Sequence, residues 1–362
     1  MICPFDSSRS LRIRRRRIHE RFTITYLPKL KKGQYDLFLP IRFVANAIFA
    51  LFTDYDVIHC YTVAFPWIGL PGYLGKLRGK FLVADWNDLW GKGGLASGNP
   101  LLFRKLMEAS EVEFARKAHR LTVVSDYLAN YSVRLGISRH DITKVPHGSE
   151  LLDFQPVQKE TARARLGLPD GPIALSVGSN TPGFAFMLEA FGEACRAVNS
   201  ARLLLLGKIE PAYSEVISDI NKDPSNHIEI VGVRLGYTFF LWLSAADVLI
   251  MPMDNSPNEW ARLPIRLVDF MAAGRPIVSN AVGEVRRVLT ANRCGLVSPV
   301  GAKSLMASNI IELFNNPHLA NSIGKAGRET AKRNYSWHEI ACRISNLYQG
   351  LLGDSGSDSS SR

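Results

Sequence analysis

Hydrophobic and polar positions along this chain predict two kinds of element in turn. Short apolar runs rich in β-branched residues indicate buried strands, and longer stretches with one apolar face indicate helices between them. Continuous apolar strands separated by amphipathic helices are typical of a parallel sheet covered on both faces. The predicted strands are residues 22–27, 56–61, 80–85, 121–125 and 142–146 in the first half, and 173–178, 202–207, 228–232, 248–253, 276–280 and 295–299 in the second.

The order of these elements predicts an α/β protein with two doubly wound, Rossmann-like domains. A polar segment with three prolines, residues 147–172, separates the two series of strands and helices. We expect the first domain at 1–150, the second at 151–335, a last helix at 336–353 and a disordered, low-complexity tail at 354–362. Open α/β sheets bind ligands at the carboxyl ends of their strands, so two such domains facing each other are expected to enclose one cleft.

The charge of the chain indicates an acidic partner. Lys and Arg number 44 against 33 Asp and Glu, a formal net charge of +11, and much of the excess lies in residues 9–21. Nucleic acid, an anionic membrane surface and phosphorylated small molecules all fit this balance, and so does a solvated basic loop. The arginine run lacks the interleaved aromatic residues of nucleic-acid binders, so we expect no nucleic-acid partner.

The longest apolar stretch, residues 37–52, is too short to span a bilayer comfortably and contains Pro40, Arg42 and Asn46. It fits a core-facing helix or an amphipathic helix lying on a membrane. The cysteines are scattered without the spacing of a metal knuckle, and a polar run stands where a secretory signal would be apolar. We therefore expect a cytoplasmic protein with free thiols and no metal site, and an amphipathic helix of this kind would allow a peripheral position on the inner face of the cell membrane.

Residues 248–279 carry the strongest candidate chemistry. A predicted strand ends at Pro252, a loop follows, and Pro264 stands where a first helical residue belongs, since its missing N–H costs nothing there. Arg262, Arg266 and Asp269 then share one face of the helix start. A helix N-terminus with two arginines suits a diphosphate, and the carboxylate suits ribose hydroxyls. A surface ion pair between Arg266 and Asp269 is the alternative.

This window resembles the donor-binding motif of glycosyltransferase family 4. The family pattern is a basic residue, a short apolar segment, an acidic residue, an aromatic residue, and then Met-Ala-Ala-Gly-Lys/Arg-Pro-Ile/Val-Val, which residues 266–278 match with Asp269 in place of the usual Glu. Further segments resemble the family in the same order, namely residues 121–156, 174–191, 241–253, 283–289 and the last helix. The resemblance implies a GT-B fold, with the last helix crossing back to pack on the first domain.

The resemblance also assigns site residues, with departures. The family places an Arg and a Lys for the donor phosphates where this chain has Ser179 and Pro182, so positive charge has to come from elsewhere. We assign donor binding to Asp269, Arg266, Arg262, Gly178, Ser179 and Lys208. A His common in the family's first domain is replaced by Asn87, beside Asp88, and we assign this pair the catalytic position, with Asp85 as a further acid near the cleft. Capping of the following turn is the alternative role for these acids.

What the resemblance implies is transfer of a sugar from a nucleotide-sugar donor to a carbohydrate or lipid-linked acceptor, with retention of configuration and no metal or other cofactor. The product would belong to cell-surface polysaccharide or glycolipid synthesis. A nucleotide-sugar epimerase is disfavoured because no His stands beside the candidate acids. A non-catalytic partner that keeps the fold is the alternative, favoured by the replacements at Asn87, Ser179 and Pro182. The donor base, the sugar and the oligomeric state do not follow from the sequence.

The front of the chain departs most from the family. Members begin with a strand, a glycine-rich loop and a helix, whereas this sequence starts inside what resembles the second strand. The strands at 22–27 and 56–61 are predicted to be buried parallel strands that need neighbours on both sides. We therefore expect either a reading frame that extends upstream of Met1 or a chain that has lost activity.

Overall fold

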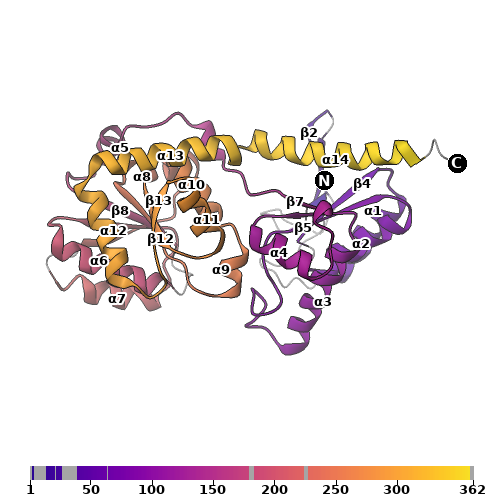
Figure 1. Ribbon diagram of the computed structural model, residues 1–362, viewed down its shortest axis with the longest axis horizontal. Coiled ribbons are helices and arrows are strands. Elements are labelled where there is room, and N and C mark those ends of the chain that lie inside the picture. Colours follow the sequence, from indigo (N-terminus) through magenta and orange to yellow (C-terminus); the bar gives the residue numbers. More distant parts are fainter. Residues whose placement is uncertain are drawn as a thin grey trace. The chain divides into compact units, whose positions relative to one another are not determined.

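A computed structural model describes residues 2–3, 14–20, 22–26, 39–62, 64–178, 183–223 and 227–358 (Figure 1). The chain divides into two compact units. The first comprises residues 1–123, 128–144 and 346–362, and the second comprises 124–127 and 145–345. The boundary therefore lies at Val145, a few residues before the one expected from the sequence, and the last helix is shared between the units.

The first unit is built on a parallel sheet whose four strands follow in chain order. The strands are β4 (Val57–Tyr61), β5 (Phe81–Trp86), β6 (Arg120–Val123) and β7 (Ile142–Lys144). On one face, Gly72 of α2 lies so close to Cys60 and Leu82 that a Cβ at this glycine would be 2.4 Å from the Cys60 sulfur. The helices of this unit are α1 (Leu39–Phe52), α2 (Pro66–Leu77), α3 (Leu101–Lys117) and α4 (Asp126–Arg134, whose first two residues count with the second unit), with η1 (Arg139–Asp141) before β7.

The opposite face of this sheet is covered by the last helix, α14 (Trp337–Asp358). Leu347 and Leu351 of α14 form a buried cluster with Val83 of β5. His59 of β4 and the Tyr348 hydroxyl share a hydrogen bond of 2.7 Å. The helix continues to Asp358, five residues beyond the end expected from the sequence, so the first part of the predicted disordered tail is helical; residues 359–362 lie outside the described part.

A separate small sheet contains the arginine run. It joins β1 (Ile2–Cys3), β3 (Phe22–Tyr26) and β2 (Arg14–His19), with β3 in the centre, parallel to β1 and antiparallel to β2. The prediction that residues 22–27 belong to the main parallel sheet is therefore wrong. Among residues 23–26 of β3, Thr25 alone is buried. The side chains of residues 15–17 are exposed, because a strand of consecutive arginines has no apolar face to bury.

The second unit has a six-stranded parallel sheet in the order β10-β9-β8-β11-β12-β13. This is the Rossmann order, in which the chain reverses direction across the sheet between β8 and β11. The strands are β8 (Ile173–Val177), β9 (Arg202–Leu206), β10 (His227–Gly232), β11 (Val248–Met251), β12 (Ile277–Asn280) and β13 (Gly295–Ser298). All six correspond to strands predicted from the apolar runs.

Helices cover both faces of this sheet, as Figure 1 shows. The core lies between the sheet and α6 and α12, where Phe184, Met187, Phe191 and Ile310 are fully buried. The helices are η2 (Glu150–Asp153), α5 (Lys159–Leu166), α6 (Gly183–Ala197), α7 (Ala212–Ile220), α8 (Gly236–Ala245), α9 (Pro257–Ala261), α10 (Ile265–Ala273), α11 (Gly283–Ala291), α12 (Lys303–Asn315) and α13 (Pro317–Tyr335). In the described part of the chain, no helix combines the length and the apolar character needed to cross a bilayer.

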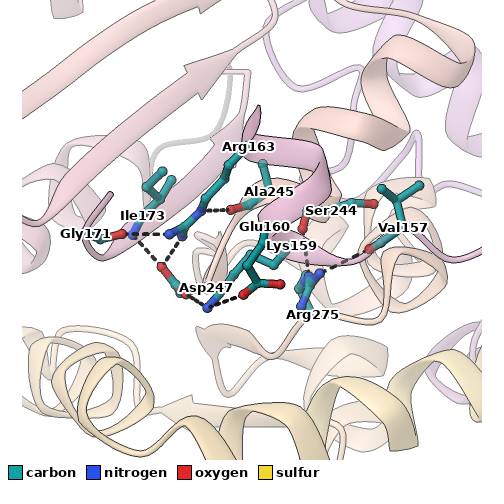
Figure 2. Close-up of polar contacts among 10 residues, drawn as sticks. All are labelled: Val157, Lys159, Glu160, Arg163, Gly171, Ile173, Ser244, Ala245, Asp247 and Arg275. Atoms are coloured by element: carbon teal, nitrogen blue, oxygen red, sulfur yellow. Dashed lines mark hydrogen bonds and ion pairs between the residues drawn. The ribbon is translucent and has the colours of Figure 1, made fainter. Parts of the chain in front are cut away.

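An ion-pair network ties α5 to the start of the second sheet (Figure 2). The Asp247 carboxylate, just before β11, lies 2.7 Å from Lys159 Nζ and 2.5 Å from Arg163 Nη2, and it accepts from the Ile173 amide at 2.7 Å. Arg163 also donates to the carbonyl of Ala245 at 2.9 Å. One carboxylate thus joins the linker helix, the first strand and the fourth strand of this domain.

Candidate donor-binding site

The candidate site lies where the second sheet reverses its direction. Ligands of open α/β sheets bind outside the carboxyl ends of the strands at this switch point. Here the ends are Gly178, after β8, and Met253, after β11. The amide of Met253 is fixed by the Asn280 side-chain oxygen at 3.0 Å, and a Cβ at Gly183, the first residue of α6, would lie 3.0 Å from the Met253 carbonyl oxygen. Backbone from three strands and a helix start therefore converges here.

Arg266 reaches this point from α10. Its Nη1 donates a hydrogen bond to the carbonyl oxygen of Val177, the last residue of β8. Gly178 has φ +72°, and a Cβ there would lie 3.3 Å from Arg266 Nη2, so a glycine leaves room for the guanidinium. Burial lowers the pKa of Arg266 and the neighbouring Arg262 lowers it further, while Glu259 and Asp269 raise it. A half-buried guanidinium at this position favours an anionic ligand.

Asp269 lies one helical turn after Arg266 but has a different partner. Its carboxylate accepts a hydrogen bond of 2.6 Å from the Ser149 hydroxyl. Burial raises the pKa of Asp269 to about 6; the Ser149 hydrogen bond and Arg266 oppose this effect, and Glu150 adds to it. Neither residue pairs with the other, so the alternative of a surface ion pair between Arg266 and Asp269 is wrong.

Arg262 is less available than the sequence suggested. It follows α9, and its Nη2 lies 2.5 Å from Glu259 Oε1, a carboxylate that is only 5% exposed. This ion pair cancels much of the charge that we assigned to the diphosphate. Two other buried acceptor atoms on α9, Asn258 Oδ1 and Glu259 Oε2, have no hydrogen-bond partner within the described residues.

The remaining assigned residues are placed as follows. Lys208 is exposed just after β9, at the same carboxyl edge of the sheet as Gly178. Ser179 and Pro182 lie outside the described residues. Pro264 is the residue that precedes α10 rather than its first helical residue, with extended backbone angles. Asn87 and Asp88 belong to the first unit, in the loop after β5, where both are half-buried.

The loop after β5 is held by a buried carboxylate that the sequence reading missed. Glu111 of α3, 1% exposed, accepts hydrogen bonds from the Trp86 indole at 2.7 Å and from the amides of Trp90 and Gly91 at 2.9 and 3.0 Å. Burial raises the pKa of Glu111 to about 7, although these three donors lower it. The loop that carries Asn87 and Asp88 is thereby fixed at both ends.

Asp85 has a structural setting. It is the fifth residue of β5, is 8% exposed, and accepts a hydrogen bond of 2.5 Å from the Thr122 hydroxyl on β6. Burial raises the pKa of Asp85 to about 6, and Asp88 adds to the effect. Its carboxylate is therefore engaged with the neighbouring strand, which leaves Asp88 as the more accessible acid of the two.

Ser149 and Arg275 show what sequence reasoning missed in the second unit. Ser149 is separated from Asp269 by 120 residues, and its own amide donates to the Tyr335 carbonyl at 3.1 Å, so no local pattern signals the pair. Arg275 matches the basic residue near the end of the family motif, yet it donates to the carbonyls of Ser244 and Val157 (Figure 2). Its role in the structure is to fix the linker.

Solved structures share this architecture. Sucrose-phosphate synthase from Thermosynechococcus elongatus superposes with a TM-score of 0.71 at 22% identity, over 91% of this chain and 84% of that one. The Anabaena protein HepE, in complex with UDP-glucose, superposes with a TM-score of 0.67 at 14% identity, over 91% and 86%. These likenesses define the class by its fold: two Rossmann-like domains, as in the GT-B glycosyltransferases.

Sequence comparison narrows the class to a family. A family model described as Glycosyltransferase Family 4 matches residues 1–151, and one described as Glycosyl transferases group 1 matches residues 171–316. A GDP-mannose-dependent monoacylated alpha-(1-6)-phosphatidylinositol monomannoside mannosyltransferase of Corynebacterium glutamicum is 25% identical over 239 residues, 63% of this chain and 61% of that protein. A phosphatidyl-myo-inositol mannosyltransferase of Mycobacterium leprae is 26% identical over 220 residues, 60% and 55%. The two family models, one on each half of the chain, together support a glycosyltransferase of the family 4 type.

The matches to these two relatives are partial. The chain spans 61% and 55% of their lengths, so less than two thirds of either.

Proposed function

We propose that the protein is a hexosyltransferase that uses a nucleotide-sugar donor. The observation that carries the proposal is the position of Arg266, whose guanidinium lies against the end of β8 at the switch point of the second sheet. Asp269 follows one turn later on the same helix with a carboxylate that has one hydroxyl partner. A diphosphate beside Arg266 and a ribose beside Asp269 fit this spacing, as they do in other nucleotide-binding folds.

The reaction follows from where charge develops. Breaking the bond between the sugar and the diphosphate places negative charge on the leaving group, and a fixed cation stabilises that charge most in a site shielded from water. Arg266 supplies this charge, with Lys208 as a second cation at the same sheet edge. Arg262 contributes less because it is paired with Glu259. We propose transfer with retention of configuration, without a metal ion or another cofactor.

The substrates are proposed at the level of their class. The Corynebacterium relative is named as GDP-mannose-dependent, both relatives named above are mannosyltransferases of phosphatidylinositol lipids, and the Anabaena structure holds UDP-glucose. For this chain we propose a nucleotide sugar as donor and a carbohydrate or lipid-linked acceptor, in polysaccharide or glycolipid synthesis. A cytoplasmic location at the membrane face fits an acceptor of this kind.

A donor panel tests the proposal. The full chain is incubated with UDP-, GDP- and ADP-sugars, and release of the nucleoside diphosphate is measured together with nucleotide affinity by calorimetry. One donor is expected to bind and to be hydrolysed slowly in the absence of acceptor. Binding without turnover on any acceptor would support the non-catalytic alternative, and no binding of any nucleotide would contradict the assignment of the site.

Arginine variants locate the diphosphate. Arg266→Ala is expected to weaken binding of the nucleoside diphosphate by about 1.5–3 kcal/mol and to leave the free nucleoside almost unchanged, since a guanidinium contributes mainly to charged hydrogen bonds. Arg286→Ala, which removes an exposed arginine from α11, is the matched control and is expected to change neither affinity. Equal losses for the nucleoside and the diphosphate would show that Arg266 acts on folding instead.

A further inference from the structure

The first two turns of α3 expose an apolar surface. Leu101, Leu102 and Leu106 are 55%, 83% and 49% exposed. The buried side of the same helix is formed by Met107, Glu111 and other residues farther along, which face the sheet of the first unit. The three leucines therefore form a second apolar face that no element among the described residues covers. Figure 1 shows α3 extending beyond the sheet of this unit.

The charge around these leucines is positive. The first two turns of α3 include Arg104 and Lys105, with Glu108 as their one acidic residue, so the net charge there is positive. On a helical surface Lys105, four residues after Leu101 and three after Leu102, is a neighbour of both, and it is itself exposed. Pro100 precedes the helix and provides no side-chain cap. The first-turn amides therefore have no capping side chain to offset the positive partial charge at the N-terminal end of the helix. Leucines with a basic rim match a bilayer with anionic head groups.

The position of this surface in the fold relates it to the acceptor. The segment that leads into α3 is the loop after β5, which leaves the sheet at the carboxyl ends of its strands. That edge is where open α/β sheets bind ligands, and it carries Asn87 and Asp88. The exposed leucines thus follow, along the chain, the loop that carries Asn87 and Asp88, the pair to which we assign the catalytic position.

We propose that Leu101, Leu102 and Leu106, together with Arg104 and Lys105, dock the protein on an anionic lipid bilayer and so present the loop after β5 to an acceptor held in that bilayer. The leucines enter the acyl boundary, and the two basic side chains remain among the lipid phosphates. The link to an acceptor rests on the proposed function. The contact with the bilayer does not, and it can be measured without any sugar donor.

Vesicle binding of the full chain tests the contact. Sedimentation is compared between phosphatidylcholine vesicles and vesicles that also contain phosphatidylglycerol, at low and high salt. Leu102→Ser is expected to lower the affinity for the anionic vesicles about tenfold, since burying a leucine contributes about 1.5–3 kcal/mol and 1.4 kcal/mol is tenfold. Lys105→Glu is expected to lower it by more than about fivefold, and less at high salt.

Two substitutions on the second unit serve as matched controls. Leu235→Ser removes a leucine that is 79% exposed, and Lys325→Glu reverses an exposed charge on α13. Neither is expected to change vesicle binding. Hydrogen exchange of the wild type provides a measurement that needs no variant: the amides of residues 101–106 are expected to exchange more slowly when anionic vesicles are added.

The outcomes separate this inference from the proposed function. Nucleotide affinity of Leu102→Ser is expected to equal that of the wild type, so a failure of the donor panel leaves the vesicle result intact. Vesicle binding that Leu102→Ser and Leu235→Ser reduce equally, or that is absent in the wild type, would overturn the inference. A wild type that ignores vesicles but forms a dimer that Leu102→Ser dissociates would show that a second copy of the chain covers these leucines.

Discussion

Replacing Glu111 with Gln tests the physical account of the loop after β5. The substitution keeps the size of the side chain and removes its ability to ionise. Burial raises the pKa of Glu111 from its ordinary value of 4.5 to about 7, so the folded protein holds this proton over a pH range in which the unfolded chain has lost it. In that range the folded state binds more protons, and the free energy of unfolding falls as the pH rises.

The size of the effect follows from that interval. Each pH unit between 4.5 and about 7 corresponds to about 1.4 kcal/mol, which gives about 3 kcal/mol in total. The Gln variant has no such titration. It is therefore expected to gain about 2–3 kcal/mol relative to the wild type between about pH 5 and about pH 8. The three donors that Glu111 accepts from do not reverse the sign, because their effect on the pKa is smaller than that of burial.

The assay has to report on the first unit alone, because a chain of two units need not unfold in one step. Hydrogen exchange with mass spectrometry across a urea series, read on peptides from β5 and α3, gives the unfolding free energy of this region. Glu113→Gln, an exposed change on the same helix, is the control. Its unfolding free energy is expected to stay within about 0.5 kcal/mol of that of the wild type at about pH 5 and at about pH 8. A difference between Glu111→Gln and the wild type that does not change with pH would refute the reasoning.

Three further expectations test other contacts. Ser149→Ala removes the hydroxyl that donates to Asp269, so the pKa of Asp269, raised to about 6 by burial, is expected to rise further; NMR titration of the carboxyl carbon measures it, and an unchanged or lower pKa would contradict the contact. Asp247→Ala leaves two basic side chains without their shared carboxylate and is expected to destabilise the second unit by about 3–5 kcal/mol in urea unfolding, whereas a loss below about 1 kcal/mol would show that water replaces the pair. Tyr348→Phe removes the hydrogen-bond partner of His59, whose pKa burial lowers to about 4. The loss is expected to lower the stability of this region by about 1–3 kcal/mol, measured by hydrogen exchange of β4 peptides. No change would show that water replaces the tyrosine hydroxyl as the partner of His59.

The order of elements was predictable from the sequence because it depends on local patterns. Short continuous apolar runs, separated by amphipathic stretches, predict strands and helices without knowledge of distant contacts. All six strands of the second sheet and the four strands of the parallel sheet in the first unit were located in this way. The helix that carries Arg266 and Asp269 was also predicted, because the proline just before it and the glycine just after it, Gly274 with φ +71°, are local signals.

The partners of the charged side chains were decided only by the tertiary structure. Arg262 is paired with a buried Glu259, Arg275 donates to the carbonyls of Ser244 and Val157, and Asp269 accepts from a serine 120 residues earlier. The arginine run forms a strand beside β3, in a sheet separate from β4. Such pairings depend on which polar atoms the folded chain brings within about 3 Å of one another. Sequence periodicity indicates which face of an element is buried, but it does not indicate which polar group from a distant segment will contact that face.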